Sequence, residues 1–213
     1  MARTRTKLDG CGIAHASDLL GQRWALLVVR ELLLGPKRFT DLRGGIPDIS
    51  PNVLGQRLRE LEESGIVRRR KLAPPAAAQV YELTEWGHAL EPAILSLGRW
   101  ASGSPSFPIG ADMGPDSLVL ALKSTFDPAK ADGLDATYEL RLGETPFRIE
   151  VSDGRFEASH GEAESPDATI RSNSNTIAGV VFGENRLGKA VESGEIEVDG
   201  SRQAVRALIK TLT

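Results

Sequence analysis

Three side chains that can read nucleic-acid bases recur along one stretch of the chain. Asn52, Gln56 and Arg59 lie four and three residues apart, so in a helix they share one face. Amide and guanidinium groups form paired hydrogen bonds with the edges of adenine and guanine in the major groove of DNA. The opposite face of this helix would turn three leucines toward a core: Leu54, Leu58 and Leu61. The spacing indicates a helix that reads bases, although an ordinary amphipathic helix with a solvated polar face shows the same pattern.

A run of four cations follows this helix on a predicted strand: Arg68, Arg69, Arg70 and Lys71. After a turn at Ala73-Pro74-Pro75, the segment from Val80 to Leu83 alternates as a returning strand. Cations on a hairpin beside a reading helix would bind DNA phosphates, which supply affinity without sequence information. A charged edge strand that prevents aggregation is the alternative interpretation.

Residues suited to catalysis or metal binding are scattered. Cys11 is the single cysteine, so no internal disulfide can form, and His15, His88 and His160 lie far apart. The sequence contains no phosphate-binding glycine loop, no Gly-x-Ser-x-Gly segment and no His-Glu-x-x-His pair. We therefore expect no enzymatic activity, no metal site and no cofactor.

Periodicity and helix-breaking residues predict the elements that position the reading face. The segment from Trp24 to Leu34 is apolar nearly all round, which predicts a buried helix, and a short second helix follows from Phe39. Ser50 would cap a third helix with Pro51 at its first position, and Gly65 would end it. Three glutamates gather toward its C-terminal end: Glu60, Glu62 and Glu63. Because they would repel phosphate, the first two turns of this helix should enter the groove.

Short motifs spread over residues 11–101 carry more information than periodicity. They are Leu20-Gly21-Gln22-Arg23-Trp24-Ala25-Leu26-Leu27, Arg30-Glu31-Leu32, Gly35, Arg38-Phe39, Asp41-Leu42, Ile49-Ser50, Val53-Leu54, Arg57-Leu58, Leu61-Glu62, Gly65 and Tyr81-Glu82-Leu83-Thr84. This set closely resembles the HxlR-type winged helix-turn-helix transcriptional regulators. The resemblance implies a homodimer on a pseudo-palindromic operator in double-stranded DNA, usually as a repressor.

The same resemblance assigns roles to individual residues. Arg38 would start the first helix of the motif, Ser50 to Arg59 would form the recognition helix, and Arg68 to Lys71 would lie in the wing. The side chains expected at the DNA are Arg38, Ser50, Asn52, Val53, Gln56, Arg57, Arg59, Arg68, Arg69, Arg70 and Lys71.

A helix capped by Thr84 is expected after the wing, kinked at Pro92 because proline removes a backbone hydrogen bond. One apolar stripe runs along it: Trp86, Leu90, Ile94, Leu97 and Ala101. In the family that the chain resembles, the equivalent helix makes the dimer contact. Packing within the same subunit is the alternative.

Cys11 occupies the place where many proteins that resemble this one carry an N-terminal sensing cysteine. Redox sensing needs a thiolate in an electropositive, partly open setting, and Arg23 is the nearest candidate cation in the sequence. A small inert hydrophobic residue is the alternative reading of a lone cysteine.

Charge divides the chain into two halves. Residues 1–102 carry 15 Lys and Arg against 11 Asp and Glu, whereas residues 103–213 carry 11 against 18. Nine of the fifteen residues from 102 to 116 are Gly, Pro or Ser, so we expect a linker there, between a DNA-binding and dimerisation domain (1–101) and a second domain (117–213). The longest apolar stretch, Trp24 to Val29, is far below the ~20 residues of a membrane span. No apolar segment follows the basic Arg3, Arg5 and Lys7, so we expect a cytoplasmic protein without membrane contact.

The second half alternates apolar and polar residues as antiparallel strands do. We expect strands at 118–122, 137–142, 147–151, through Phe156, at 167–172 and at 196–198, with helices at 176–182, at 187–191 and after Ser201. This order resembles the sterol-carrier-protein-2-like fold, as do the segments Asp153-Gly154, Gly161, Asp167-Ala168-Thr169 and Gly194 to Gly200. The expected fold class is therefore α+β, a winged helix-turn-helix domain followed by an antiparallel sheet with covering helices.

Proteins that resemble this second fold hold apolar molecules between the sheet and its helices. Carried over, that role would make five residues the wall of a ligand site: Phe147, Ile149, Ile177, Val181 and Phe182. Plain core packing is the alternative for each. The resulting hypothesis is a regulator whose operator affinity responds to an apolar ligand or to oxidation of Cys11. The rival is an apolar-metabolite carrier that uses the winged domain for self-association.

Overall fold

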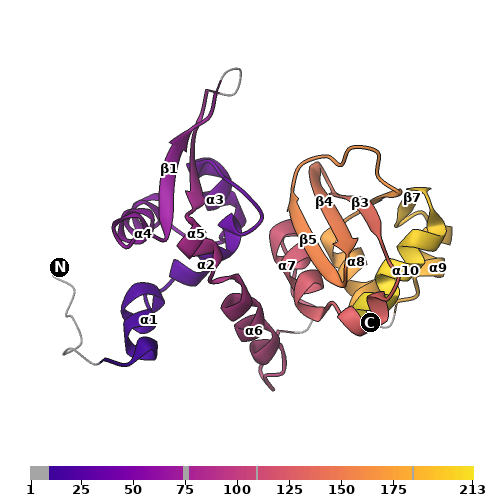
Figure 1. The fold of residues 1–213 in the computed structure, drawn as a ribbon, viewed down its shortest axis with the longest axis horizontal. Helices are drawn as coiled ribbons and strands as arrows, with labels where there is room; N and C mark the ends of the chain where they lie inside the picture. The colour runs from indigo at the N-terminus through magenta and orange to yellow at the C-terminus, as the bar shows by residue number, and fades with distance from the viewer. Residues whose placement is uncertain (1–9, 74–76, 109, 184) are drawn as a thin grey trace. The chain divides into compact units, whose positions relative to one another are not determined.

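The computed structural model describes residues 10–73, 77–108, 110–183 and 185–213 (Figure 1). The described chain divides into two compact units, Met1–Ile94 and Leu95–Thr213, and the division falls inside one helix. The predicted basic start of the chain (Arg3, Arg5 and Lys7) and the Pro74-Pro75 turn lie outside the described residues.

The first unit consists of helices and one hairpin. Its elements are α1 (Gly12–Leu20), α2 (Ala25–Leu32), α3 (Phe39–Gly45), α4 (Pro51–Glu63), β1 (Val67–Lys71), β2 (Gln79–Leu83), α5 (Glu85–His88) and α6 (Glu91–Ser102), which continues into the second unit. The core lies between α2, α3, α4 and the base of the hairpin, where Val28, Leu32 and Leu42 are fully buried. The far end of the hairpin extends beyond the helices (Figure 1).

The third predicted helix is confirmed as α4. The Ser50 hydroxyl accepts a hydrogen bond from the Val53 amide at 3.3 Å, and Pro51 is the first helical residue. All three leucines of the predicted core stripe are at most 1 % exposed. Gly65 follows the helix with φ of +74°, a conformation that glycine adopts without steric cost.

The apolar helix predicted after Thr84 is two helices in the structure. Thr84 caps α5 by accepting a hydrogen bond from the Gly87 amide at 3.0 Å, but α5 ends at His88 and α6 begins at Glu91. The expected kink at Pro92 is therefore wrong, because the helix is interrupted between His88 and Glu91, before Pro92. Pro92 lies in the first turn of α6, where its missing amide hydrogen costs nothing.

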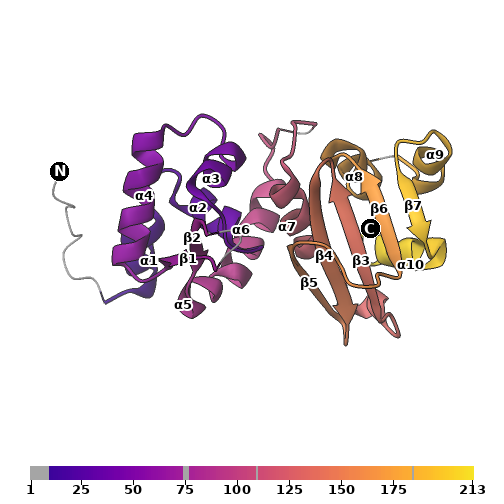
Figure 2. The ribbon, with the colours of Figure 1, turned by 90° about the horizontal axis from the view of Figure 1, so that it is seen from above.

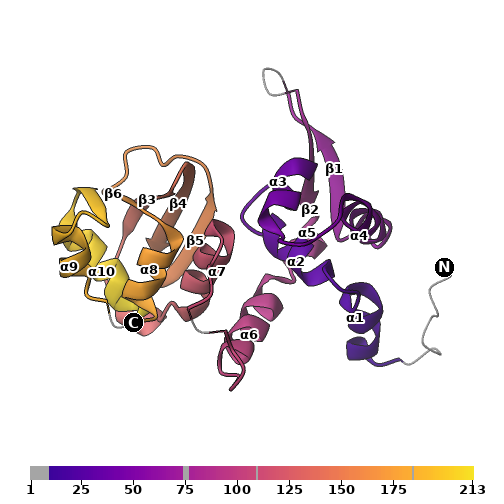
Figure 3. The ribbon, with the colours of Figure 1, turned by 180° about the vertical axis from the view of Figure 1, so that it is seen from behind.

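The second unit is a mixed sheet with helices. Its elements are α7 (Pro115–Thr125), the 3-10 turn η1 (Pro128–Ala131), β3 (Ala136–Leu142), β4 (Thr145–Ser152), β5 (Arg155–His160), β6 (Ala168–Ser172), α8 (Ser174–Val181), α9 (Leu187–Glu192), β7 (Glu197–Gly200) and α10 (Arg202–Leu212). The strand order is β5-β4-β3-β6-β7, and β3 and β6 pair in parallel while the other pairs are antiparallel (Figure 2). The expected antiparallel sheet is therefore wrong for β3 and β6, because the chain crosses from β5 at one edge to the other side of β3 before β6 begins. Seen from behind, α8 and α10 lie in front of the sheet (Figure 3).

The predicted alternation in the second half is confirmed for two central strands. Tyr138 and Leu140 of β3 lie opposite Ile149 and Phe147 of β4, and all four are at most 2 % exposed. The Tyr138 hydroxyl donates to the carbonyl of Ala204 in α10 at 3.0 Å, so this face of the sheet is the one that α10 covers. Ser201 caps α10 as expected, because its hydroxyl accepts from the Ala204 amide at 3.1 Å.

The strand predicted at 118–122 is wrong. These residues lie in α7, which starts with Pro115 at its first position and Asp116 in its first turn. Leu118, Val119 and Leu122 are all buried, so the segment lacks the exposed alternate positions of a surface strand. Periodicity alone does not separate a short buried helix from a buried strand, and the proline before the run was the informative residue.

Candidate nucleic-acid interface

The N-terminal turns of α4 present the predicted reading residues to solvent. Asn52, Gln56 and Arg59 are exposed, while the leucines on the opposite side of the helix are buried. Gln56 Nε2 donates to Glu60 Oε1 at 3.1 Å, so the amide lies along the helix surface. Ser50 is exposed at the N-cap and Val53 is half-buried on one flank. The structure thus brings amide and guanidinium groups together on one accessible helix face.

Arg57 differs from the other predicted DNA-contacting side chains of α4. Its side chain is only 11 % exposed, and its Nη1 atom pairs with Glu60 on the next turn. Its Nε atom is buried and has no hydrogen-bond partner within the described residues. In this conformation Arg57 packs against its own helix and does not extend from the reading face.

Arg38 lies where the resemblance implied, at the start of α3. It is the N-cap residue, it is exposed, and its backbone amide donates to Asp41 Oδ2 at 3.2 Å. An acceptor in the first turn satisfies an amide that has no partner inside the helix. The cap holds α3 at its N-terminal end and leaves the Arg38 side chain in solvent.

A buried charged cluster, made of Arg30, Glu31 and Lys37, holds the helix-turn-helix together. Glu31 of α2 is 2 % exposed and accepts from Lys37 Nζ at 2.6 Å and from Arg30 Nη2 at 2.7 Å. Arg30 Nη2 also donates to the carbonyl of Gly45, the last residue of α3, at 3.2 Å. A Cβ on Gly45 would lie 2.0 Å from Glu31 Oε2, so only glycine permits this approach. Sequence reasoning missed the cluster, although a glutamate inside an apolar helix is a sign of a buried pair.

Lys37 also connects the motif to the hairpin. Its backbone exchanges two hydrogen bonds with Tyr81 of β2, at 3.0 and 2.8 Å. Lys37, which pairs with Glu31, is therefore also bonded to β2, the returning strand of the hairpin. The helix α2 and the returning strand of the hairpin are thus both bonded to Lys37.

Two of the four hairpin cations share a carboxylate. Arg68 and Arg70 alternate on one face of β1 and donate their Nε hydrogens to the two oxygens of Glu82 at 2.7 and 2.8 Å. Burial would raise the pKa of Glu82, but the hydrogen bonds from Arg70 and Arg68 outweigh it and hold the pKa below its usual value. The arginine side chains remain 65 % and 47 % exposed.

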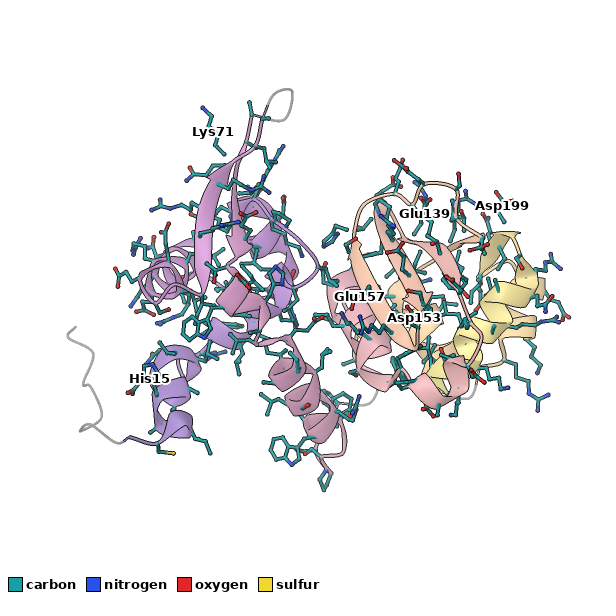
Figure 4. All side chains as sticks on the ribbon, viewed as in Figure 1. His15, Lys71, Glu139, Asp153, Glu157 and Asp199 are labelled. Carbon is teal, nitrogen blue, oxygen red and sulfur yellow. The ribbon has the colours of Figure 1, made fainter. Side chains whose placement is uncertain are left out.

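The other two hairpin cations lie on the opposite face of β1. Arg69 Nε donates to Glu62 Oε1 of α4 at 2.8 Å, and this carboxylate raises the pKa of Arg69. Lys71 forms no ion pair within the described residues and lies near the outer end of the hairpin (Figure 4). Three of the four hairpin cations thus have carboxylate partners, and their expected contact with phosphates stays a prediction. Within the described residues each of these arginines bonds its carboxylate through Nε alone.

Two residues of the predicted apolar stripe are exposed, and the other three are half-buried. Trp86 is 53 % and Leu97 is 45 % exposed, while Leu90, Ile94 and Ala101 are half-buried. Two further exposed apolar side chains were missed by sequence reasoning, Trp100 of α6 at 77 % and Ile13 of α1 at 81 %. Neither α1 nor α6 contains a buried residue.

Cys11 is exposed at the N-cap of α1. Hydrogen bonds from the backbone amides of Ala14 and Ile13 lower the pKa of its thiol. The predicted cation Arg23 lies over the ring of Trp24, 4.5 Å from its centroid. The groups that lower the pKa of the Cys11 thiol are therefore backbone amides, whereas Arg23 packs over Trp24.

Sequence comparison decides the family. Residues 19–105 match the family model described as HxlR-like helix-turn-helix. The HTH-type transcriptional regulator YvaP of Bacillus subtilis is 38 % identical over 94 residues, covering 43 % of this chain and 87 % of YvaP. YodB of the same organism is 42 % identical over 86 residues, covering 40 % of this chain and 77 % of YodB. The chain belongs to the HxlR-like helix-turn-helix family.

Solved structures of such regulators also match. The reduced form of YodB from B. subtilis has 37 % identity and a TM-score of 0.40, covering 48 % of this chain and 98 % of that one. The redox regulator HypR in its oxidized form has 32 % identity and a TM-score of 0.42, covering 45 % and 99 %. Because both scores are below 0.5, the family assignment rests on sequence. This HxlR-like protein is a DNA-binding transcriptional regulator.

The second unit of this HxlR-like regulator has its own match. Residues 109–213 match the family model described as alkyl sulfatase C-terminal. The sterol-carrier-protein-2-like fold remains a prediction. Of the predicted ligand wall, Phe147 and Ile149 are fully buried, and Ile177 and Val181 are 4 % and 7 % exposed. Phe182 is different, because it is 44 % exposed.

Two hollows of the second unit lie away from the predicted ligand wall. An open hollow of about 610 Å³ is lined by the segments 128–135 and 153–154, and a smaller one of about 200 Å³ lies over β4 and β5. Neither is lined by a residue of the predicted ligand wall. Within the described residues, no cluster of histidine, cysteine and carboxylate side chains could hold a metal ion. Among the same described residues, no helix is long and apolar enough to span a membrane.

Proposed function

We propose that this HxlR-like regulator binds a pseudo-palindromic operator as a homodimer and represses transcription. The first turns of α4 read base edges, and the hairpin binds the flanking phosphates. The observation that carries this proposal is the exposure of Asn52, Gln56 and Arg59 on a helix whose opposite face is buried. Amide and guanidinium groups at helical spacing fit the acceptor and donor patterns of adenine and guanine.

The ion pairs of the hairpin are compatible with phosphate binding. Each arginine is bonded to its carboxylate through Nε, which leaves its two terminal nitrogens for a phosphate. A guanidinium fixed at one edge has already lost part of its rotational freedom before DNA arrives. Lys71 adds a cation at the outer end of the hairpin.

The uncovered apolar side chains support the homodimer. Trp86, Leu97 and Trp100 are each about half or more exposed, which is costly for side chains of this size in water. A second copy of the chain that covers α5 and α6 would remove this cost and would place two reading helices on one operator.

The second unit would act as the sensor. We propose a sterol-carrier-protein-2-like fold that takes an apolar molecule beside α8, where Phe182 follows the buried Ile177 and Val181. The ligand changes operator affinity only if it prefers one state of the dimer to the other. Titration of apolar ligands against operator-bound protein tests this, and equal affinity at saturating ligand would remove the sensor role.

Selection from a random DNA pool with the full chain tests the proposal as a whole. A groove reader enriches one inverted repeat, and its affinity falls steeply with salt, with a log–log slope of about −0.9 per neutralised phosphate. The rival function, a carrier of apolar metabolites, enriches no sequence at any salt concentration. Enrichment of an inverted repeat would also support the dimer.

Thiol sensing is a second candidate, because Cys11 is exposed and its pKa is lowered by backbone amides. Two Cys11 thiols in a dimer would lose two electrons and two protons to an oxidant such as diamide and would form one disulfide. Operator affinity measured before and after diamide treatment tests this, with Cys11→Ser as the control. An equal response of both proteins to diamide would exclude Cys11.

A further inference from the structure

Gly55 stands in the middle of the reading helix although nothing inside the chain requires a glycine there. Its φ is not in the left-handed region, so its backbone conformation is open to any residue. A Cβ added to it would have one neighbour within 4 Å, Arg59 Nη1 at 3.7 Å, which is an ordinary van der Waals distance. Glycine in a helix interior is unfavourable compared with alanine. The chain therefore carries a cost in stability that its own packing does not explain.

Several other glycines of the same unit have an internal reason. A Cβ on Gly45 would collide with the Glu31 carboxylate at 2.0 Å, and one on Gly87 would collide with the carbonyl of Ile66 at 2.2 Å. Gly65 has a positive φ. Gly55 shares none of these features, and neither does Gly44 of α3, so the position of Gly55 on the reading helix is what distinguishes it.

The position of Gly55 on α4 indicates what approaches it. Glu62 lies seven residues later, two turns along the same flank of the helix, and it is bonded to Arg69 of the hairpin. Gly55 therefore lies on the flank that faces the wing. Asn52 and Gln56 lie on the adjoining exposed face, so the flank of Gly55 borders the reading surface. In a helix-turn-helix complex the edge of the recognition helix faces the sugar-phosphate backbone that borders the groove.

A cation lies over Gly55. The Arg59 guanidinium reaches back toward it, as helical side chains do, with Nη1 3.7 Å from the position of an added Cβ. Arg59 supplies the positive charge that a phosphate requires, and the absent side chain of Gly55 leaves the space.

We propose that Gly55 is a DNA contact point, where a backbone phosphate comes into van der Waals contact with the helix and is neutralised by Arg59. The inference rests on the proposed reading function of α4. It makes Gly55 a residue that sets how deeply the helix enters the groove. A Cβ at this position would hold the helix away from every duplex, whatever its sequence.

The test is Gly55→Ala in the full chain, with two readouts that should move in opposite directions. Unfolding followed by tryptophan fluorescence should occur a few degrees higher than in the parent protein, because alanine favours the helix. Affinity for the selected operator and for a scrambled duplex, measured by fluorescence anisotropy, should fall by a similar factor of about ten. Unchanged or tighter DNA binding would overturn the inference, and a loss confined to the operator would overturn the assignment to phosphate.

A matched control uses a second helical glycine. Gly188 of α9 has nothing within 4 Å of an added Cβ, so Gly188→Ala makes the same change in open space in the other unit. It should leave both DNA affinities unchanged. The parent protein and Gln56→Ala are measured in parallel. If the parent binds no operator, the proposed function fails. If the parent binds, and Gly55→Ala binds both duplexes as tightly as the parent and Gly188→Ala do, the inference about Gly55 fails alone.

Discussion

Arg69 of the hairpin and Glu62 of the reading helix form a direct bond, with 2.8 Å between Nε and Oε1. The pair joins the element that would bind phosphates to the C-terminal half of the element that would read bases. If Arg69 binds a phosphate as proposed, Glu62 would compete with that phosphate for the same guanidinium. Both side chains are partly exposed, at 49 % and 29 %, so DNA can replace the carboxylate.

The first prediction concerns this pair. Arg69→Ala should weaken binding to operator and scrambled DNA alike and should lower the salt slope by about one, because one phosphate contact is lost. Glu62→Gln should instead tighten binding to both duplexes, because it releases Arg69 and removes a negative charge near the phosphates. Anisotropy titrations over a range of salt concentrations measure both effects. Glu63→Gln on the same helix controls for charge alone; weaker binding by Glu62→Gln would show that Glu62 positions Arg69 and does not compete with DNA.

The second prediction concerns the buried charged cluster of Arg30, Glu31 and Lys37. Glu31→Gln removes the buried carboxylate that pairs with Lys37 Nζ at 2.6 Å and with Arg30, and should lower the unfolding free energy of the first unit by about 3 kcal/mol. All three tryptophans lie between residues 24 and 100, so urea unfolding followed by their fluorescence reports on this part of the chain. Glu63→Gln, at an exposed position, should change stability little. Equal stability of the two variants would show that the cluster does not hold the motif.

The third prediction is a dependence of stability on pH through Glu82. Its pKa is below the usual value in the folded state, so its contribution is fully present above about pH 4.5 and is lost as the pH falls through the lower, folded value. The unfolding free energy of the parent protein should therefore decline on acidification below pH 4.5. Glu82→Gln should lose stability near neutral pH and should show a flatter acid limb. Parallel pH profiles for the two proteins would contradict the account of Glu82.

The fourth prediction concerns the exposed apolar side chains of α6. Trp100→Ala should raise the dimer dissociation constant about tenfold or more, as loss of a large aromatic at an interface does. Sedimentation equilibrium measures this change, and the far-ultraviolet circular dichroism should stay the same. Phe182→Ala removes another exposed aromatic, which follows α8 and is 44 % exposed, and should leave the dimer intact. A dimer unaffected by Trp100→Ala would place the interface elsewhere.

Local signals made much of this fold predictable. Ser50, Thr84 and Ser201 each cap a helix as their position before a periodic segment indicates, and the alternation in β3 and β4 gives the buried face of the sheet. These features depend on residues close in sequence. The strand predicted at 118–122 is wrong because five consecutive apolar residues show neither a helical nor a strand periodicity. A fully buried segment of this kind can be either a helix or a strand.

Partners distant in the sequence could not be predicted. The Glu82 carboxylate that holds Arg68 and Arg70 comes from the returning strand, and the pairing needs the register of the hairpin. Arg57 was expected at the DNA, but its pairing with Glu60 and its low exposure depend on side-chain conformation. Trp100 was missed because the stripe was continued from Leu97 to Ala101, four residues on, although Trp100 lies three residues after Leu97. The sequence therefore predicts which face of α4 is exposed, but it does not predict the ion pairs around that face.

The account depends most on the first turns of α4 reading bases, and Gln56→Ala tests this directly. Selection from a random DNA pool is carried out in parallel with the parent protein and the variant, at one salt concentration. The account predicts that the variant still binds DNA but accepts several bases at one position in each half of the inverted repeat, where the parent accepts one. An identical consensus for both proteins would contradict it.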